Sequence, residues 1–269
     1  MLSYLVSISS VKSSIYYEKQ VGFQPKKRYK KMSDKRIISG LQKLTLLDFP
    51  GKLACTVFTA GCNFACPFCH NAMLIDPASA NYSDVDAEKV LAFLKKRTGT
   101  LEGVCITGGE PLLFAEIIDF IKEVKKLGFA IKLDTNGSFP DRLIQVVEDK
   151  LIDYVAMDIK NSPEKYLATA GISSQLVFDK VKESVNYLLQ KKIDFEFRTT
   201  VVSPLHTPSD FIKIGEWIKG ADKYFLQQFT NSGNILNLDM NLKALPQEEL
   251  LQCLSNVQTF VPNASIRGQ

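Results

Sequence analysis

Three cysteines, Cys62, Cys66 and Cys69, lie within the stretch G-C-N-F-A-C-P-F-C-H-N at residues 61–71. An odd number of closely spaced thiols cannot pair completely in disulfides, so the stretch favours a metal centre. Structural zinc takes four Cys or His ligands, and His70 follows Cys69 directly, so both side chains cannot easily reach one ion. Three thiolates can instead hold a four-iron four-sulfur cluster with one iron open for chemistry.

The Cys-x3-Cys-x2-Cys spacing, with the aromatic Phe68 just before the third cysteine, resembles the signature of the radical S-adenosylmethionine (SAM) superfamily. The C-H-N ending and the lead-in G-L-Q-K-L-T-L-L-D-F-P-G-K at residues 40–52 resemble more particularly the activating enzymes of glycyl-radical enzymes. Among these, the sequence is similar to activating proteins of anaerobic ribonucleoside-triphosphate reductases. The likeness extends from about Met32 to the C-terminus.

The resemblance implies that Cys62, Cys66 and Cys69 hold one 4Fe-4S cluster and that SAM binds the open iron through its amino and carboxylate groups. One electron from the reduced cluster then splits SAM into methionine and a 5′-deoxyadenosyl radical, which abstracts hydrogen from a glycine of a partner enzyme. The implied enzyme is a radical SAM oxidoreductase. Its implied partners are an anaerobic ribonucleoside-triphosphate reductase and a flavodoxin- or ferredoxin-type electron donor.

Two other functions stay open at this point. One is a radical SAM enzyme that acts on a small nucleoside-like substrate, and the other is a non-catalytic zinc or iron-sulfur binding module. Metal content after anaerobic purification, and a glycyl-radical protein encoded nearby, would discriminate among the three.

Short apolar runs alternate with amphipathic stretches of helical period downstream of the lead-in, a pattern typical of parallel strands joined by crossover helices. Six such units predict an α/β fold, an open partial parallel βα barrel, which the resemblance identifies with the radical SAM type. The predicted strands are Leu53–Ala60, Gly103–Thr107, Ala130–Asp134, Tyr154–Ile159, Asp194–Val202 and Tyr224–Phe229, with a last short strand at Ala264–Arg267. The predicted helices are Asp86–Arg97, Phe114–Leu127, Arg142–Glu148, Val177–Gln190, Ser209–Lys219 and residues 247–258.

Active sites in barrels of this kind form at the carboxyl ends of the strands, which is where the cysteine stretch falls. The next two strands end in T-G-G-E-P at residues 107–111 and L-D-T-N-G at residues 133–137. Alone, each is more typical of an ordinary turn, but the nearby cysteines favour a functional reading. By resemblance, the first motif holds the SAM amino group and the second lies against SAM. The SAM-binding candidates are therefore Gly108, Gly109, Glu110, Asp134, Thr135 and Asn136, with Phe68 and His70 of the cysteine stretch.

Charged residues stand at the end of the fourth predicted strand, with Asp158 and Lys160 in M-D-I-K, and within the fifth, with Arg198 in F-R-T-T-V-V. A buried cation needs an anionic partner, and the SAM carboxylate would supply one for Lys160 and Arg198. A purely structural pair of Arg198 with Asp158 is an equally good alternative. Where the pyruvate formate-lyase activating enzyme has a histidine at the end of strand six, this chain has Phe229 and Thr230, which leaves the wall for adenine unassigned.

The remaining histidine and cysteines are expected to be structural. His206, in S-P-L-H-T-P, is predicted on the surface of a loop. Cys55 and Cys105 lie in apolar strands and Cys253 on an amphipathic helix, so each is predicted to be a small core residue. No cysteine-rich insert lies between Asn71 and Asp86, so no additional ferredoxin-like cluster is expected.

The net charge of +4 is unevenly distributed, because residues 1–31 carry seven basic residues and one acid. The rest of the chain is slightly acidic, so no nucleic-acid partner is predicted. The first residues lack the features of a signal peptide and are too short and polar for a membrane span. Cysteines kept for metal binding suit the reducing cytoplasm. We interpret residues 1–31 as a disordered basic head or an upstream extension, and residues 32–269 as one radical SAM domain.

Overall fold

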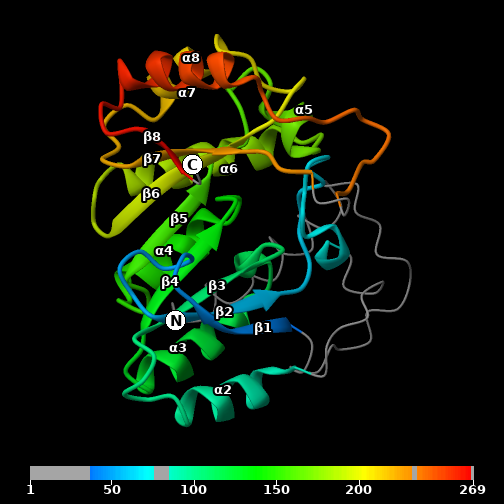
Figure 1. The fold of residues 1–269 in the computed structure, drawn as a ribbon. Helices are drawn as coiled ribbons and strands as arrows, with labels where there is room; N and C mark the ends of the chain where they lie inside the picture. The colour runs from blue at the N-terminus through cyan, green and yellow to red at the C-terminus, as the bar shows by residue number, and fades with distance from the viewer. Residues whose placement is uncertain (1–36, 76–84, 232–234, 268–269) are drawn as a thin grey trace, which may run out of the picture.

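The computed structural model describes residues 37–75, 85–231 and 235–267, and these residues form one eight-stranded sheet. The strands lie side by side in their sequence order, from β1 to β8. Strands β2 to β8 pair in parallel, whereas β1 pairs antiparallel with β2. The sheet curves between its two edge strands, β1 and β8, with helices on its outer side (Figure 1). The predicted α/β partial barrel is confirmed.

The element bounds agree closely with the sequence prediction, because apolar runs and helical periods mark them clearly. The strands are β1 (Ile38–Thr45), β2 (Ala54–Thr59), β3 (Gly103–Gly108), β4 (Ala130–Thr135), β5 (Tyr154–Asp158), β6 (Asp194–Val201), β7 (Tyr224–Gln228) and β8 (Ser265–Arg267). The helices are α2 (Ala87–Lys95), α3 (Ile117–Lys126), α4 (Pro140–Glu148), α5 (Tyr166–Ala170), α6 (Gln175–Leu188), α7 (Asp210–Trp217) and α8 (Gln247–Gln258), with short 3-10 turns η1 (Ala72–Leu74) and η2 (Pro111–Leu113).

Besides the two 3-10 turns, β1 and α5 were not predicted. Strand β1 lies at an edge, and three of its eight residues are exposed, so it lacks the apolar run that marks a buried strand. Helix α5 has only five residues, too few to display a helical period. It ends at Gly171, whose left-handed conformation (φ +65°) is a common helix stop.

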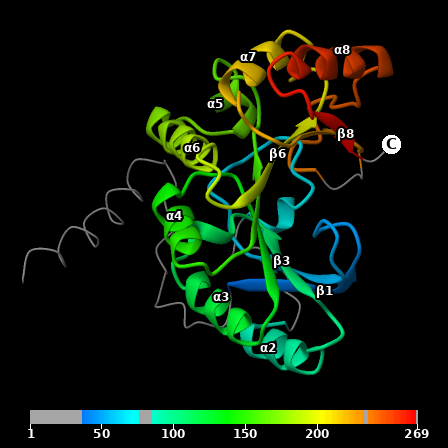
Figure 2. The same ribbon diagram turned by 90° about the vertical axis from the view of Figure 1, so that its left-hand side faces the viewer.

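The outer face of the sheet is apolar and packs against the helices. Val104 and Ile106 of β3, Ile131 of β4 and Ile117 and Ile121 of α3 are fully buried in one apolar cluster. Figure 2 shows α2, α3, α4 and α6 in a row along this outer side. Burial of the outer face leaves the alternate residues of each strand pointing to the inner face.

The inner face of the sheet carries polar and charged side chains. Cys105 and Lys132 are register partners on β3 and β4, and the Lys132 Nζ lies 3.9 Å from the Cys105 Sγ. Asp134 lies two residues beyond Lys132, on the same face. The charged side chains of the inner face therefore continue toward the carboxyl ends of the strands.

The predicted head, residues 1–31, lies outside the described residues. None of the helices in the part of the chain that the structure describes has the length and apolar character needed to cross a membrane.

Candidate active site

The cysteine loop, residues 61–75, leaves the carboxyl end of β2 and is closed at its base by main-chain hydrogen bonds. The Gly61 N–H donates to the Leu74 carbonyl at 2.6 Å, and the Cys62 N–H donates to the Ile75 carbonyl at 3.2 Å. Gly61 adopts a φ of +85°, which favours glycine at this turn. The loop lies at the right-hand end of the strands in Figure 1, in cyan. The fold thus places the loop at the predicted end of the sheet.

Helix α5 supports the middle of the cysteine loop. The Ala65 N–H donates to the Ala170 carbonyl at 3.1 Å, and the Cys66 Sγ lies 3.6 Å from the same oxygen. A Cβ atom on Gly171 would lie 2.2 Å from the Ala65 carbonyl oxygen. This contact requires glycine, so Gly171 is a positioning residue that sequence analysis missed. The signal was present as a glycine that could cap a short helix.

The three thiols are buried or half-buried on this loop. Burial raises the pKa of Cys66 to about 11, although the charge of Lys160 acts to lower it. Burial also raises the pKa values of Cys62 and Cys69. Thiols in such surroundings are protonated at neutral pH and give up their protons when they bind metal.

The donor set fits an iron-sulfur cluster better than a single ion. Within residues 37–75, 85–231 and 235–267, no three Cys, His, Asp or Glu side chains gather as ligands of a single metal ion. In a four-iron cluster each thiolate binds a different iron, so the sulfur atoms need not converge on one point. Three thiols on one loop are therefore a suitable donor set for a cluster with one open iron.

The glycines that end β3 bring this strand into direct contact with the base of the cysteine loop. A Cβ atom on Gly109 would lie 2.0 Å from the Gly61 carbonyl oxygen, and one on Gly108 would lie 2.3 Å from the Thr59 nitrogen. The Glu110 N–H donates to the same Gly61 carbonyl at 2.8 Å. Because Gly108 and Gly109 have no Cβ, the main chain at the end of β3 can pack directly against the main chain at the base of the cysteine loop. This close packing positions Cys62.

Glu110 connects the ends of β3 and β4. Its buried carboxylate accepts hydrogen bonds from the Leu112 N–H (3.0 Å), the Thr135 hydroxyl (2.8 Å) and the Asn136 N–H (2.7 Å). Burial raises the pKa of Glu110 to about 7, against the lowering effect of these donors. Glu110 therefore fixes Thr135 and Asn136, and the Asn136 Nδ2 in turn lies 3.9 Å from the Cys62 Sγ.

A row of five charged side chains crosses the inner face of the sheet over β4, β5 and β6. Asp134 pairs with Lys132 and, at 2.9 Å, with the Arg198 Nη2. Asp158 pairs with the Arg198 Nε at 2.5 Å and with the Lys160 Nζ at 2.9 Å. The structural pair of Arg198 and Asp158 is present, with Asp134 as a second partner.

The charged row holds three cations and two carboxylates. Burial acts to raise the pKa values of Asp134 and Asp158, but Arg198 and the neighbouring lysines outweigh it and hold both below their usual range. Lys160, at one end of the row, also acts on Cys66 and Cys69. The excess positive charge beside the thiols suits an anionic cluster and the carboxylate of SAM.

The two aromatic candidates of the cysteine loop have different surroundings. Phe68 is buried, with its ring edge-on to His206 at a centroid distance of 6.4 Å. His70 stacks on Phe229 at 5.4 Å, and its Nε2 lies 2.7 Å from the Thr230 carbonyl. The end of β7 thus meets the cysteine loop through the residues at the position left unassigned for adenine.

The prediction that His206 lies on the surface is wrong, because the residue is only 2% exposed. Its Nδ1 accepts from the Val202 N–H at 3.2 Å, and its Nε2 lies 2.9 Å from the Lys160 carbonyl. The main chain satisfies both ring nitrogens, which allows a polar ring to be buried inside a loop. His206 therefore packs between Phe68 and the end of β5. Cys55 and Cys253 are buried in the apolar cluster, as predicted, whereas Cys105 is buried on the charged inner face, with its Sγ 3.9 Å from the Lys132 Nζ.

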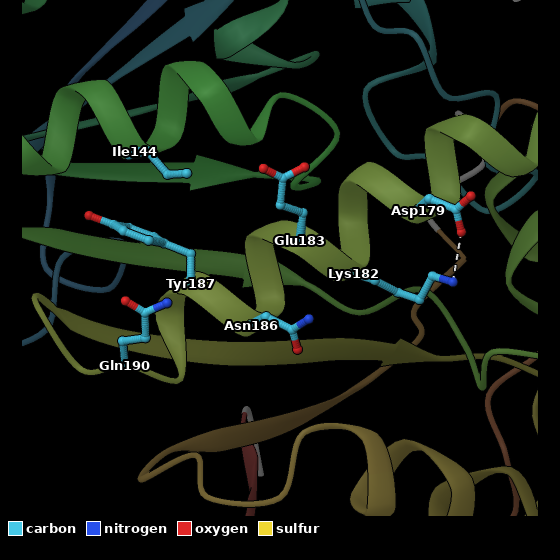
Figure 3. A pocket seen from close by; sticks show the side chains of 7 residues that line it. All are labelled: Ile144, Asp179, Lys182, Glu183, Asn186, Tyr187 and Gln190. Atoms are coloured by element: carbon cyan, nitrogen blue, oxygen red, sulfur yellow. Dashed lines mark ion pairs between the residues drawn. The ribbon is translucent and has the colours of Figure 1, made fainter.

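A groove of about 520 Å³ lies between α4 and α6 on the outer side of the fold (Figure 3). Ile144 of α4 and Tyr187 of α6 contribute to its lining, and Asp179 and Lys182 pair at 2.7 Å along its rim. None of the candidate residues line it. The chemistry is therefore assigned to the cysteine loop and the charged row.

Comparison with known proteins agrees with this geometry. The protein-family model described as the radical SAM superfamily matches residues 56–218, more than half of the chain. The chain belongs to the radical SAM superfamily. Enzymes of this superfamily use a 4Fe-4S cluster and SAM, so the predicted family, its enzymatic character and both cofactors are confirmed.

Two relatives are named as activating enzymes. A protein of Methanocaldococcus jannaschii named as a glycyl-radical enzyme activating enzyme is 28% identical over 87% of this chain and 96% of its own length. The pyruvate formate-lyase-activating enzyme of Listeria monocytogenes is 27% identical over 68% of this chain and 75% of its own. The crystal structure of Streptococcus suis SuiB bound to precursor peptide SuiA shares the fold, with a TM-score of 0.62 at 14% identity over 79% of this chain and 48% of that chain.

Proposed function

We propose that this radical SAM enzyme activates an anaerobic ribonucleoside-triphosphate reductase by generating a glycyl radical on it. The observation that carries the proposal is the similarity to the M. jannaschii activating enzyme, which extends over 96% of that protein. A likeness of this extent includes more than the cofactor-binding loop. The similarity of the sequence to activating proteins of anaerobic ribonucleoside-triphosphate reductases supports the choice of the reductase as partner.

In this proposal Cys62, Cys66 and Cys69 hold the cluster, in the domain of residues 32–269. When bound and reduced, the cluster supplies the electron that cleaves SAM to methionine and a 5′-deoxyadenosyl radical, which takes a hydrogen atom from the glycine. The protein residues hold and orient the reacting groups. The flavodoxin- or ferredoxin-type donor and the cytoplasmic location are part of the same proposal.

The remaining strand-end residues are assigned to SAM and its surroundings. Gly108 and Gly109 let the main chain approach the cysteine loop, and Glu110 orients Thr135 and Asn136. Lys160 and Arg198 supply positive charge for the SAM carboxylate, with Asp134 and Asp158 holding them in place. Phe68 and His70 line the proposed SAM site on the side of the cysteine loop, where the His70 ring stacks on Phe229.

The shape of the sheet suits a protein substrate. Among the described residues β1 and β8 form two separate edges, so the strands do not close into a full barrel. A small metabolite normally requires enclosure, whereas a peptide segment can enter between open edges. The partner would present its glycine on a segment exposed by local opening.

Electron paramagnetic resonance (EPR) of the partner tests this proposal. After anaerobic incubation of the reductase with this protein, SAM and a reductant, we expect a glycyl-radical doublet. The doublet should be lost when the reductase glycine is changed to alanine or when Cys66 is changed to alanine here. SAM cleavage without a radical on the reductase, together with consumption of a small nucleoside-like compound, would contradict the proposal and favour the small-molecule function.

A further inference from the structure

Three polar side chains form a closed ring of hydrogen bonds between the cysteine loop and the loop that follows β4. The Asn63 Nδ2 donates to the Ser138 Oγ at 2.9 Å, and the Ser138 hydroxyl donates to the Asn136 Oδ1 at 2.6 Å. The Asn136 Nδ2 then donates to the Asn63 Oδ1 at 3.1 Å. Asn136 and Ser138 are buried, so the ring is shielded from competing water.

The ring determines which way the Asn136 amide points. Its Oδ1 accepts from both the main-chain N–H of Ser138, at 2.9 Å, and the Ser138 hydroxyl. A flipped amide would set its NH₂ group against the Ser138 N–H, donor against donor. The Glu110 carboxylate also holds the main-chain N–H of Asn136, at 2.7 Å. The Nδ2 is therefore fixed on the side of the cysteine loop.

One N–H of the Asn136 amide donates to the Asn63 Oδ1, and the Asn136 Nδ2 also lies 3.9 Å from the Cys62 Sγ. The Phe64 N–H lies 3.4 Å from the same sulfur. Cys66 differs, because its Sγ lies 3.6 Å from the Ala170 carbonyl, a group that cannot donate. The Asn136 and Phe64 donors are thus aimed at the Cys62 sulfur.

We propose that Asn136, oriented by Asn63 and Ser138, donates a hydrogen bond to the Cys62 sulfur and thereby raises the reduction potential of the cluster. Hydrogen bonds to ligand sulfur stabilise the reduced state, which carries more negative charge. Residues that contact a ligand in this way tune a metal centre without binding the metal. This role rests on the proposed assignment of Cys62 as a cluster ligand, and it differs from a direct contact of Asn136 with SAM.

The test is the midpoint potential of the reconstituted cluster, measured by anaerobic redox titration followed by EPR without SAM. Asn136→Ala should shift the potential to a more negative value than that of the wild type. Asn63→Ala and Ser138→Ala should shift it in the same direction by less, because they loosen the amide without removing it. Asn186→Ala, at an exposed position on α6, is the control and should leave the potential unchanged.

Potentials equal to the wild type in Asn63→Ala and Ser138→Ala, and in Asn136→Ala where it retains the cluster, would overturn the inference. The two weaker variants keep the test valid if Asn136→Ala loses the cluster, because they leave the amide and all three cysteines in place. The titration needs neither SAM cleavage nor the partner enzyme. Failure to activate the reductase would therefore count against the proposed function and would not affect the comparison of potentials.

Discussion

Replacing Asp158 with asparagine is expected to lower the free energy of unfolding by about 3 kcal/mol at neutral pH. Asp158 accepts from both Arg198 and Lys160, so its loss leaves three cations in the charged row with Asp134 alone. Breaking a buried ion network from one side leaves charge that water cannot solvate. The expected loss is at the low end for buried pairs, because 29% of the Asp158 side chain is exposed.

The stabilising contribution of Asp158 depends on pH. The pKa of Asp158 is held below the usual Asp value of 3.8, so its stabilising contribution is present above that value and is lost as the pH falls below it. Urea unfolding should show a constant difference between wild type and Asp158→Asn from pH 7 to pH 5, which narrows only below about pH 4. The control is Glu216→Gln, which breaks the exposed pair with Lys213 and should change stability by less than about 1 kcal/mol. Equal losses in the two variants would show that the charged row does not stabilise the fold.

Replacing Gly109 with alanine is expected to lower the rate of SAM cleavage on the order of 100-fold. The new methyl group would lie 2.0 Å from the Gly61 carbonyl oxygen and 2.6 Å from its carbon, both main-chain atoms. Relief of this overlap has to move the residue that directly precedes Cys62. The substitution should also lower the free energy of unfolding by about 1 to 3 kcal/mol, as overpacking usually does.

Iron content, SAM cleavage and urea unfolding of Gly109→Ala test this account of the glycine. Gly40→Ala is the matched control, because its Cβ would make only ordinary contacts, the nearest at 3.5 Å from the Phe58 ring. That variant should behave as wild type in all three measurements. A Gly109→Ala protein with full iron content and the wild-type rate would show that close packing of β3 on the cysteine loop is not required.

The parts of the fold that could be predicted from sequence are those with a local signal. Strands β2 to β7 are rich in apolar residues and alternate with crossover helices that have amphipathic stripes, so period and length define them. The cysteine spacing is equally local. Strand β1 was not predicted, because an edge strand with exposed side chains has no continuous apolar run.

The site could be predicted only where its residues lie in short motifs at strand ends. The charged row depends on the register of β4, β5 and β6, which aligns Asp134 with Ala156 and Asp158 with Arg198. Sequence suggested the pair of Asp158 and Arg198 but could not show that Asp134 joins it. Tertiary contacts of this kind have no periodic signature.

Loop residues were the hardest to assign. Asn63 and Ser138 meet across 75 positions of sequence, and each alone is an ordinary polar loop residue. His206 was misplaced because its neighbours are typical of a surface turn, whereas main-chain partners allow it to be buried. Burial of a polar side chain depends on partners that only the folded chain brings together.

Formation of 5′-deoxyadenosine by anaerobically reconstituted protein tests most directly whether the cysteine loop holds the cluster that cleaves SAM. With a reductant, we expect the wild type to bind about four irons per chain and to form 5′-deoxyadenosine. Cys62→Ala, Cys66→Ala and Cys69→Ala should each abolish the product, whereas Cys55→Ala and Cys253→Ala, which change buried core residues, should retain it. Stoichiometric zinc in place of iron, or product formation that survives Cys66→Ala, would contradict the account.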